Sequence, residues 1–210
     1  MKAHTDEMPT VRPATLADID GLRAMLARAF ADDPLIAWAL PNRVNRVEHT
    51  EAWLGWFLDA YLADGVVHCI DDLAAVLWLP PGQRAAEPPE GTPTLHDLLT
   101  DLNGHDHATR VLTGFASSGP RRPTDAHIYL HILGVAPEAQ GKGLGAEVLG
   151  PMLTLSDDDV VSIHLESANP RNHAFYERLG FERTGVDHLG EGGPTLTSFC
   201  REPSGDLEIA

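Results

Sequence analysis

The segment Gln140-Gly141-Lys142-Gly143-Leu144-Gly145 has the residue types of a phosphate-binding turn. Glycine lets the backbone turn sharply and leaves room for a ligand to approach. An apolar-periodic stretch follows, and the free N–H groups at the start of a helix attract a pyrophosphate. Lys142 adds a positive charge. We predict a phosphate cradle here, although a glycine turn that binds no ligand would have the same pattern.

Two side chains are candidates for accepting a proton during catalysis. The strand predicted over 127–135 alternates in such a way that Tyr129, His131, Leu133 and Val135 should share one face. Histidine as a residue type can gain or lose a proton near neutral pH, so His131 is a candidate general base. Glu166, at the end of the next predicted strand, is the second candidate. A core histidine and an ordinary strand-end carboxylate are the competing interpretations.

A nicotinamide-dinucleotide site is a rival interpretation of the same glycines. Gly141-x-Gly143-x-x-Ala146 nearly matches the dinucleotide fingerprint, and Glu166 would then bind a ribose. In that fold, however, the first glycine follows its strand at once, whereas residues 136–140 intervene here. No parallel strand–helix series surrounds the segment either, so we disfavour this interpretation.

Hydrophobic periodicity and turn residues predict the elements that must position these side chains. A Thr15–Asp18 capping box should start a helix over 16–30, which Asp32-Asp33-Pro34 should break. The other expected elements are a helix over 44–64, a hairpin of 66–70 and 74–79, a loop over 80–90, polar helices within 94–115, a strand at 127–135, a helix at 141–155, a strand at 160–166, a helix at 170–179, and strands at 181–186 and 195–200. This order predicts an α/β (α+β) fold with a mixed sheet and helices on both faces.

Composition limits the classes of partner and compartment. The chain has 210 residues, 43% of them hydrophobic, which suits one compact domain or a domain with an insertion. Its 15 basic and 31 acidic residues give a net charge of −16, which argues against nucleic-acid binding and would attract a cationic amine. The polar start, residues 1–10, has no apolar signal core and is expected to be flexible. We therefore expect a cytoplasmic protein without a membrane span.

Neither the cysteines nor the histidines predict a cross-link or a metal site. Cys69 and Cys200 have no Cys-x-x-Cys spacing and are expected to be reduced. His105-Asp106-His107 resembles a metal-binding cluster, but no third spaced ligand follows. We predict a solvated polar loop there and no metal.

Two elements together resemble the GNAT superfamily of N-acetyltransferases. The first is the Val-x-Pro-x-x-Gln-Gly-x-Gly-Leu-Gly pattern from Val135 to Gly145; the second runs from Asn169 through Phe175-Tyr176 to Gly180-Phe181. The resemblance is close over 127–186, the expected acetyl-CoA-binding core, and does not reach 80–126, the expected variable insertion. It implies a single 1–210 domain with a mostly antiparallel sheet whose strands splay at the acetyl-CoA site. Within the superfamily the chain looks most like the puromycin N-acetyltransferase branch, which also has a match to Ala29–Pro34.

The resemblance also implies how acetyl-CoA is held. The backbone of Leu133, Gly134 and Val135 would bind the pantetheine amides, and Asn169 and Asn172 would contact the pantetheine arm. The pyrophosphate would lie on the backbone of Gln140, Gly141, Lys142, Gly143, Leu144, Gly145 and Ala146. Asn169 before Pro170 would equally serve as a helix N-cap.

Tyr176 would protonate the leaving CoA thiolate, as a neutral phenol can. A core aromatic is the competing interpretation. The strand around His131 is similar to the His-Leu-His-x-x-x-Val strand of arylalkylamine N-acetyltransferases. Tyr129 departs from that pattern and cannot act as a base at neutral pH. The proton acceptor therefore stays open between His131, Glu166 and a water chain.

The acceptor pocket is expected to be formed by the first two helices and the loop between them. Its candidates for an apolar wall with an acidic group are Phe30, Asp33, Trp38, Trp53 and Phe57. Such a wall suits a small hydrophobic amine, and the expected activity is transfer of acetyl from acetyl-CoA to a primary amine by direct attack in a ternary complex. A role in antibiotic resistance would fit. The alternatives are a non-catalytic acyl-CoA sensor and a protein or peptide N-acetyltransferase; a monomer and a homodimer are both compatible with the sequence.

Overall fold

A computed structural model describes residues 10–117 and 123–204. The expected flexible start therefore lies almost wholly outside the described residues. Within them, seven strands form one sheet in the order β1-β2-β3-β4-β5-β7-β6. The strands are β1 (Arg12–Pro13), β2 (Val66–Ile70), β3 (Ala74–Leu79), β4 (Ile128–Val135), β5 (Ile163–Ser167), β6 (Glu182–His188) and β7 (Thr195–Arg201). Only β4 and β5 pair in parallel, which confirms the predicted mixed, mostly antiparallel sheet.

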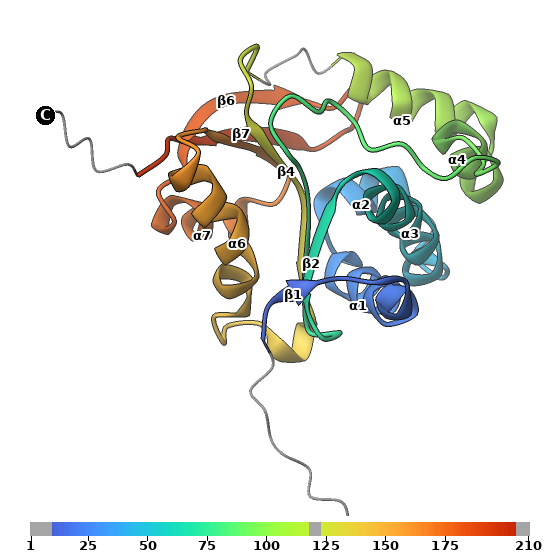
Figure 1. The fold of residues 1–210 in the computed structure, drawn as a ribbon. Helices are drawn as coiled ribbons and strands as arrows, with labels where there is room; N and C mark the ends of the chain where they lie inside the picture. Colours follow the sequence, from blue (N-terminus) through green and yellow to red (C-terminus); the bar gives the residue numbers. More distant parts are fainter. Residues whose placement is uncertain (1–9, 118–122, 205–210) are drawn as a thin grey trace, which may run out of the picture.

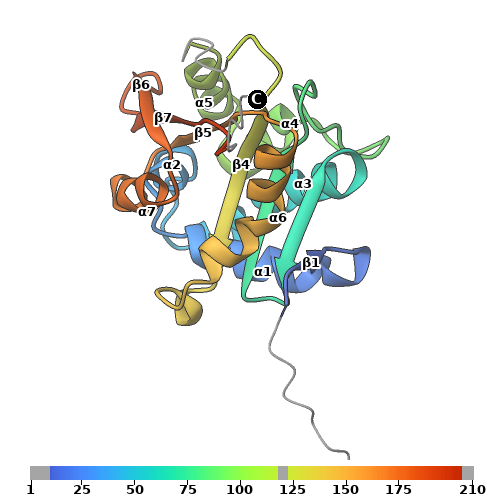
Figure 2. The ribbon, with the colours of Figure 1, turned by 60° about the vertical axis from the view of Figure 1, so that its left-hand side comes forward.

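Helices cover both faces of the sheet, as predicted (Figures 1 and 2). On one face lie α1 (Ile19–Phe30) and α3 (Arg46–Asp64); on the other lie α6 (Leu144–Asp158) and α7 (His173–Arg178). Each face has its own buried cluster. The first joins Leu22, Leu26, Leu58, Leu77 and Ile132, and the second joins Val76, Leu130, Val148, Met152 and Ile163. The sheet is thus buried on both sides in its centre.

The first helix ends near Asp32-Asp33-Pro34, as predicted, but a second, short helix, α2 (Pro34–Ala39), begins at once. Asp33 is its N-cap, because the carboxylate accepts the N–H of Leu35 at 2.9 Å, and Pro34 lies in the first turn. The predicted Thr15–Asp18 capping box is present and precedes a 3₁₀ turn, Leu16–Asp18, that leads into α1.

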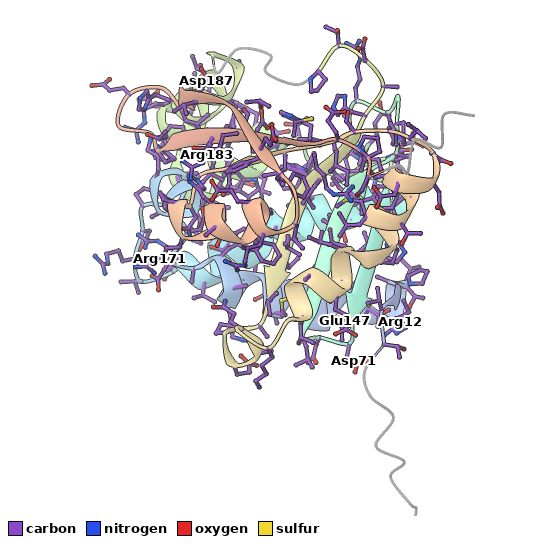
Figure 3. The ribbon with its side chains drawn as sticks, turned by 90° about the vertical axis from the view of Figure 1, so that its left-hand side faces the viewer. Arg12, Asp71, Glu147, Arg171, Arg183 and Asp187 are labelled. Carbon is purple, nitrogen blue, oxygen red and sulfur yellow. The ribbon has the colours of Figure 1, made fainter. Side chains whose placement is uncertain are left out.

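The end of the sheet near β1 is fixed by ion pairing. Arg12 donates to Asp18 at 2.7 and 2.9 Å. Figure 3 shows Arg12 close to Asp71, at the turn of the β2–β3 hairpin. The hydrogen bond to Asp18 and the charge of Asp71 raise the pKa of the Arg12 guanidinium. The hairpin itself has the predicted bounds.

The segment between β3 and β4 contributes two helices, α4 (Leu95–Asn103) and α5 (His105–Ser117). They attach to α2 and α3 through a third apolar cluster that includes Ile36, Trp53, Leu99 and Val111. Figure 1 shows this helical pair beside α2 and α3. No helix in the described ranges is long and apolar enough to cross a membrane.

Candidate active site

The central feature of the site is a gap between β4 and β5. The two strands pair only from Ile128 to Leu130 on β4 and from Ile163 to Leu165 on β5. Beyond these residues β4 continues along β3 to Val135, while β5 continues along β7 to Ser167. The strands therefore separate in the middle of the sheet, which is the predicted splay.

A β-bulge at His131 changes which side chains face which helices. Leu77 lies opposite Ile132 and Trp78 opposite Leu130, so His131 is the extra residue of the bulge. Tyr129 and His131 point toward α3, whereas Leu133 packs against the cluster on the α6 side. The expectation that Tyr129, His131 and Leu133 share one face is therefore wrong, because one inserted residue shifts the two-residue alternation.

The backbone of β4 presents hydrogen-bonding groups to the gap. The N–H of Ala136 donates to the carbonyl of Leu73 at 2.8 Å, toward β3. Because these groups alternate in direction along a strand, those of Leu133 and Val135 point away from β3 and those of Gly134 point toward it. The side chain of Gln140 donates to the Val135 carbonyl at 3.2 Å. The Leu133 groups and the Val135 N–H are thus the predicted pantetheine contacts that face the gap.

The absence of a side chain at Gly134 is explained by helix packing. A Cβ on this residue would lie 2.5 Å from Cδ2 of Leu26. The missing side chain therefore lets α1 pack directly on β4.

A cavity of about 570 Å³ extends from the α7 side of the gap to the helices on the other face. All three predicted catalytic residues, Tyr176, His131 and Glu166, line it. So do Leu133, Asn172 and four of the five residues predicted for the acceptor wall: Phe30, Asp33, Trp53 and Phe57. Its volume lies within the range of small-molecule sites. The structure thus brings the separately predicted groups to one cavity.

His131 is held from α3. Its Nδ1 lies 2.8 Å from the Tyr61 hydroxyl, and its ring meets the Phe57 ring edge to face at 4.8 Å. These contacts fix the ring orientation. The tautomer decides whether Tyr61 donates to Nδ1 or accepts from it.

Glu166 lies across the gap from β4. The Tyr129 hydroxyl donates to its Oε2 at 3.1 Å, and Nε2 of His164 lies 3.8 Å from its Oε1. The carboxylate side chain is 20% exposed. Glu166 is therefore a partly buried acid with a fixed orientation, rather than a mobile strand-end carboxylate.

Tyr176 is buried in α7, with the rings of Phe175, Phe181 and Phe199 around it. Burial, and to a smaller extent the charge of Asp33, raises the pKa of the Tyr176 phenol above its ordinary value. The hydroxyl therefore stays protonated at neutral pH. Tyr176 is thus a core aromatic that also lines the cavity, and its role as the proton donor stays a prediction.

Asp33 is a half-buried acid at the N-terminus of α2. Burial raises its pKa, although hydrogen bonds from the backbone of Leu35 and Ile36 and from the Asn169 side chain oppose the rise. Its effect on Tyr176 places it near the α7 end of the cavity. Asp33 thus lines the cavity and is linked to the turn after β5 through Asn169.

The glycine segment has the geometry of an open anion cradle. Gly141 and Gly143 have φ values of +75° and +90°, and a Cβ on either would meet nothing within 4 Å. Gly143 is the left-handed N-cap of α6, which is why this helix begins at Leu144 rather than at the predicted Gly141. Lys142 is exposed beside it. The N–H of Ala146, predicted to bind the pyrophosphate, donates to the Gly143 carbonyl at 3.0 Å. The first two N–H groups of α6, those of Leu144 and Gly145, are therefore the ones that suit a pyrophosphate.

The two predicted asparagines lie at the turn after β5. The Asn169 side chain accepts the N–H of Arg171 at 3.2 Å, so it is the expected N-cap of the 3₁₀ turn Pro170–Asn172. Asn172 is exposed and lines the cavity. Of the pair, Asn172 is the one that offers its side chain to a ligand.

The helical pair of the insertion supplies part of the acceptor wall, which the sequence did not reveal. Leu95, Leu112, Phe115 and Ala116 line the cavity. The apolar spacing of Leu112, Phe115 and Ala116 in α5 was the available signal. Trp38, predicted for the wall, lies behind Phe115 at 6.2 Å between ring centroids. It supports the wall without lining the cavity.

The cluster His105-Asp106-His107 is not a loop, as was predicted, but the first turn of α5. Nε2 of His107 lies 2.8 Å from the Ala39 carbonyl, so this side chain fastens α5 to the end of α2. In the ranges that the structure describes, no group of three or more His, Cys, Asp or Glu residues has a metal-binding arrangement.

Comparison with known proteins identifies the relatives of this chain. The sequence model of the Acetyltransferase (GNAT) family matches residues 70–181. A mycothiol acetyltransferase of Kineococcus radiotolerans is 30% identical over 208 residues, which cover 91% of this chain and 66% of that protein. The N-alpha-acetyltransferase RimI of Mycobacterium tuberculosis is 32% identical over 77 residues, which cover 36% of this chain and 49% of that protein. The chain spans less than two thirds of the length of either relative.

A solved structure has the same fold. The crystal structure described as histone acetyltransferase HPA2 and related acetyltransferase, from Corynebacterium glutamicum, superimposes with a TM-score of 0.69 at 22% identity, covering 93% of this chain and 97% of that one. At this identity the likeness supports the fold alone.

Proposed function

Because the chain belongs to the GNAT family of acetyltransferases, we propose that it moves an acetyl group from acetyl-CoA to the primary amine of a small molecule. The observation that carries the proposal is the cavity through the β4–β5 gap. It joins Tyr176 and Asn172 on one side to His131, Glu166 and an aromatic wall on the other. One connected space can therefore hold the reacting ends of both substrates at once, as direct transfer in a ternary complex requires.

The family generally uses acetyl-CoA, and the residues of this chain fit that cofactor. The open cradle at Gly141 and Gly143, with the first amides of α6, suits the pyrophosphate. The Leu133 backbone groups and the Val135 N–H suit the pantetheine amides, as an added strand would be bound. When bound there, acetyl-CoA supplies the thioester whose acetyl group is transferred.

Residues on the two sides of the gap divide the proton chemistry. His131 or Glu166 takes the proton of the amine so that its nitrogen lone pair can attack the thioester carbonyl. Tyr176 donates a proton to the departing sulfur. The burial that raises the pKa of the phenol raises that of a thiolate in the same site, so the transfer remains possible.

The acceptor is proposed to be a small amine with an apolar body, because Trp53, Phe57 and Phe115 form much of the wall. The resemblance to the puromycin N-acetyltransferase branch, an aminonucleoside or antibiotic acceptor, a role in resistance and a cytoplasmic location stay predictions. So do the single 1–210 domain and the oligomeric state. The partial similarity to RimI keeps a protein N-terminus as the alternative acceptor.

A substrate screen tests the proposal. Thiol release from acetyl-CoA should be measured with aryl and alkyl amines, aminonucleosides, amine antibiotics, polyamines and amino acids, and separately with peptides that have a free N-terminus. We expect turnover with a small hydrophobic amine. Turnover with peptides alone would favour the protein acetyltransferase; binding of acetyl-CoA with no turnover in any class would favour the sensor. Binding of NADH in place of acetyl-CoA would revive the dinucleotide interpretation.

A substitution that adds a negative charge at Gly143 tests the proposed phosphate cradle. The substitution Gly143→Asp puts a carboxylate where the pyrophosphate is proposed to lie, and Asp tolerates a positive φ better than most residues do. We expect the KM for acetyl-CoA to rise about tenfold or more, with a smaller effect at high salt. Gly143→Asn, which has the same shape without the charge, is the matched control. Equal effects of the two variants would refute a phosphate at this turn.

A substitution at Phe115 tests whether the helical pair α4–α5 contributes to binding of the acceptor. Its ring meets those of Trp38 and Trp53 edge to face and lines the cavity. We expect Phe115→Ala to raise the KM for a hydrophobic amine by about tenfold or more, since burial of such a ring stabilises by about 1.5–3 kcal/mol, and to leave the KM for acetyl-CoA unchanged. Leu102→Ala, which trims the same helical pair outside the cavity lining, is the control. A Phe115→Ala enzyme with an unchanged amine KM would mean that acceptors bind elsewhere.

A further inference from the structure

One buried imidazole beside the cavity has no part in the reaction as proposed so far. His164 is 1% exposed and lies on β5 two residues before Glu166, so the two side chains share a face of the sheet. Its Nε2 is buried and has no hydrogen-bond partner among the described residues. A buried polar atom without a partner costs about 1–3 kcal/mol. The position of this nitrogen therefore calls for a physical reason.

An oxygen of the candidate base Glu166 lies close to this nitrogen. Nε2 of His164 lies 3.8 Å from Oε1 of Glu166, which is too long for a hydrogen bond but within one small movement of one. The other carboxylate oxygen, Oε2, already accepts the Tyr129 hydroxyl at 3.1 Å. The carboxylate thus lies between a phenol that donates to one oxygen and an imidazole that faces the other.

The packing around His164 holds its ring in place. Tyr129 lies directly opposite it in the parallel pairing, and the two rings stack at 6.2 Å between centroids. The ring of His127 meets it edge to face at 5.8 Å. Cys200 of β7 lies opposite it on the other side. With neighbours on both flanking strands, the imidazole cannot easily turn away from Glu166.

We propose that His164 is a positioning residue whose Nε2 accepts a hydrogen bond from Glu166 once that carboxyl has taken the proton of the amine. This assignment rests on the proposed function. An N–H bond of the protonated amine breaks, its electron pair stays on nitrogen as the lone pair that attacks the thioester carbonyl, and the proton forms a bond to Oε1. The C–S bond then breaks with its electron pair on sulfur, which takes the proton of Tyr176. The imidazole, in the tautomer that has its hydrogen on Nδ1, then accepts that O–H at Nε2. The hydrogen bond exists only in the protonated state of Glu166 and therefore stabilises the state that the reaction creates.

The geometry distinguishes Glu166 from His131 as the proton acceptor. The Nδ1 of His131 faces Tyr61. Oε2 of Glu166 accepts the Tyr129 hydroxyl, which suits the ionised carboxylate, and Oε1 faces Nε2 of His164, which suits the protonated carboxyl. Tyr129 orients the carboxylate before the transfer, and His164 receives the carboxyl hydrogen after it. His131 then orients or desolvates the amine.

Two amide substitutions test the proposal. His164→Gln keeps an acceptor oxygen near the place of Nε2, whereas His164→Asn keeps one only near Nδ1. We expect His164→Asn to lower kcat by about tenfold or more while both KM values stay unchanged, and His164→Gln to retain most of the activity. A residue with a merely structural role would be disturbed by both amides and would show no such difference. Unfolding temperature and acetyl-CoA affinity monitor the fold of each variant.

A double-mutant cycle with Glu166→Gln separates the possible outcomes. In that background, where no carboxyl can be protonated, His164→Asn should cost nothing further. Full kcat in folded His164→Asn, or an equal further loss in the Glu166→Gln background, would overturn the assignment. Absence of turnover in the unmodified chain with every amine would overturn the proposed function and the assignment with it. If His164→Asn does not fold, loss of kcat in folded His164→Gln to the level of Glu166→Gln would contradict the proposal.

Discussion

Tyr176→Phe is expected to lower kcat by about 100-fold, the usual scale of a lost general acid, while the KM for acetyl-CoA changes little. The phenol is buried among three aromatic rings, so removal of one oxygen leaves the packing intact. Burial raises its pKa, so the hydroxyl is protonated and ready to donate over the whole neutral range. Initial rates of thiol release against both substrates measure the effect.

The control for Tyr176→Phe is a check that the variant still folds and binds acetyl-CoA. An unchanged unfolding temperature and unchanged acetyl-CoA affinity would show that only the hydroxyl was lost. A variant that keeps full kcat would show that Tyr176 is a core aromatic, and that solvent protonates the departing thiolate.

Glu166→Gln is expected to lower kcat by about 100-fold or more at neutral pH, because the amide keeps the shape but cannot accept a proton. The deficit should shrink as the pH rises past the pKa of the amine, since the substrate then arrives neutral. The matched variant His131→Gln should cost less in kcat and more in the KM for the amine. A pH series of kcat for the two variants makes the comparison.

The opposite ranking would identify a different base. If His131→Gln loses kcat and regains it at high pH while Glu166→Gln keeps its rate, the proton goes to His131, and the role inferred for His164 is wrong. Small effects in both variants would favour a water chain.

The elements with strong local signals were predicted from the sequence nearly residue by residue. The hairpin of β2 and β3 has the predicted bounds because its apolar strands flank a turn at Asp71-Asp72. The Thr15–Asp18 capping box and the Asn169 cap likewise depend only on near neighbours. Gly143 shifted the start of α6 by three residues, since its left-handed conformation makes it the N-cap rather than part of the helix.

The parts of the site that depend on contacts between distant segments could not be predicted. The prediction that alternate residues of β4 share a face holds only for a strand without a bulge, and the bulge at His131 moves Leu133 to the other face. Asp33 was expected to end a helix, yet its side chain caps the next one. The approach of His164 and Tyr129 to Glu166 follows from the strand register, which a single sequence does not give.

The acceptor wall shows the same limit. Trp53 and Phe57 of α3 line the cavity, because their helical spacing places them on one face, and their contact with the acceptor stays a prediction. Phe115 reaches the cavity only because α5 folds back onto α2 and α3, and no motif in residues 80–126 signals that return.

The central claim is that this cavity brings acetyl-CoA and an amine together across the β4–β5 gap. Its most direct test is the stoichiometry of one reaction of the unmodified chain: free CoA thiol and N-acetylated amine measured together over time with the best amine of the screen. We predict equal amounts of both products, formed only when amine and acetyl-CoA are present together. Thiol release that does not depend on the amine, or acetyl-CoA binding without either product, would contradict the account.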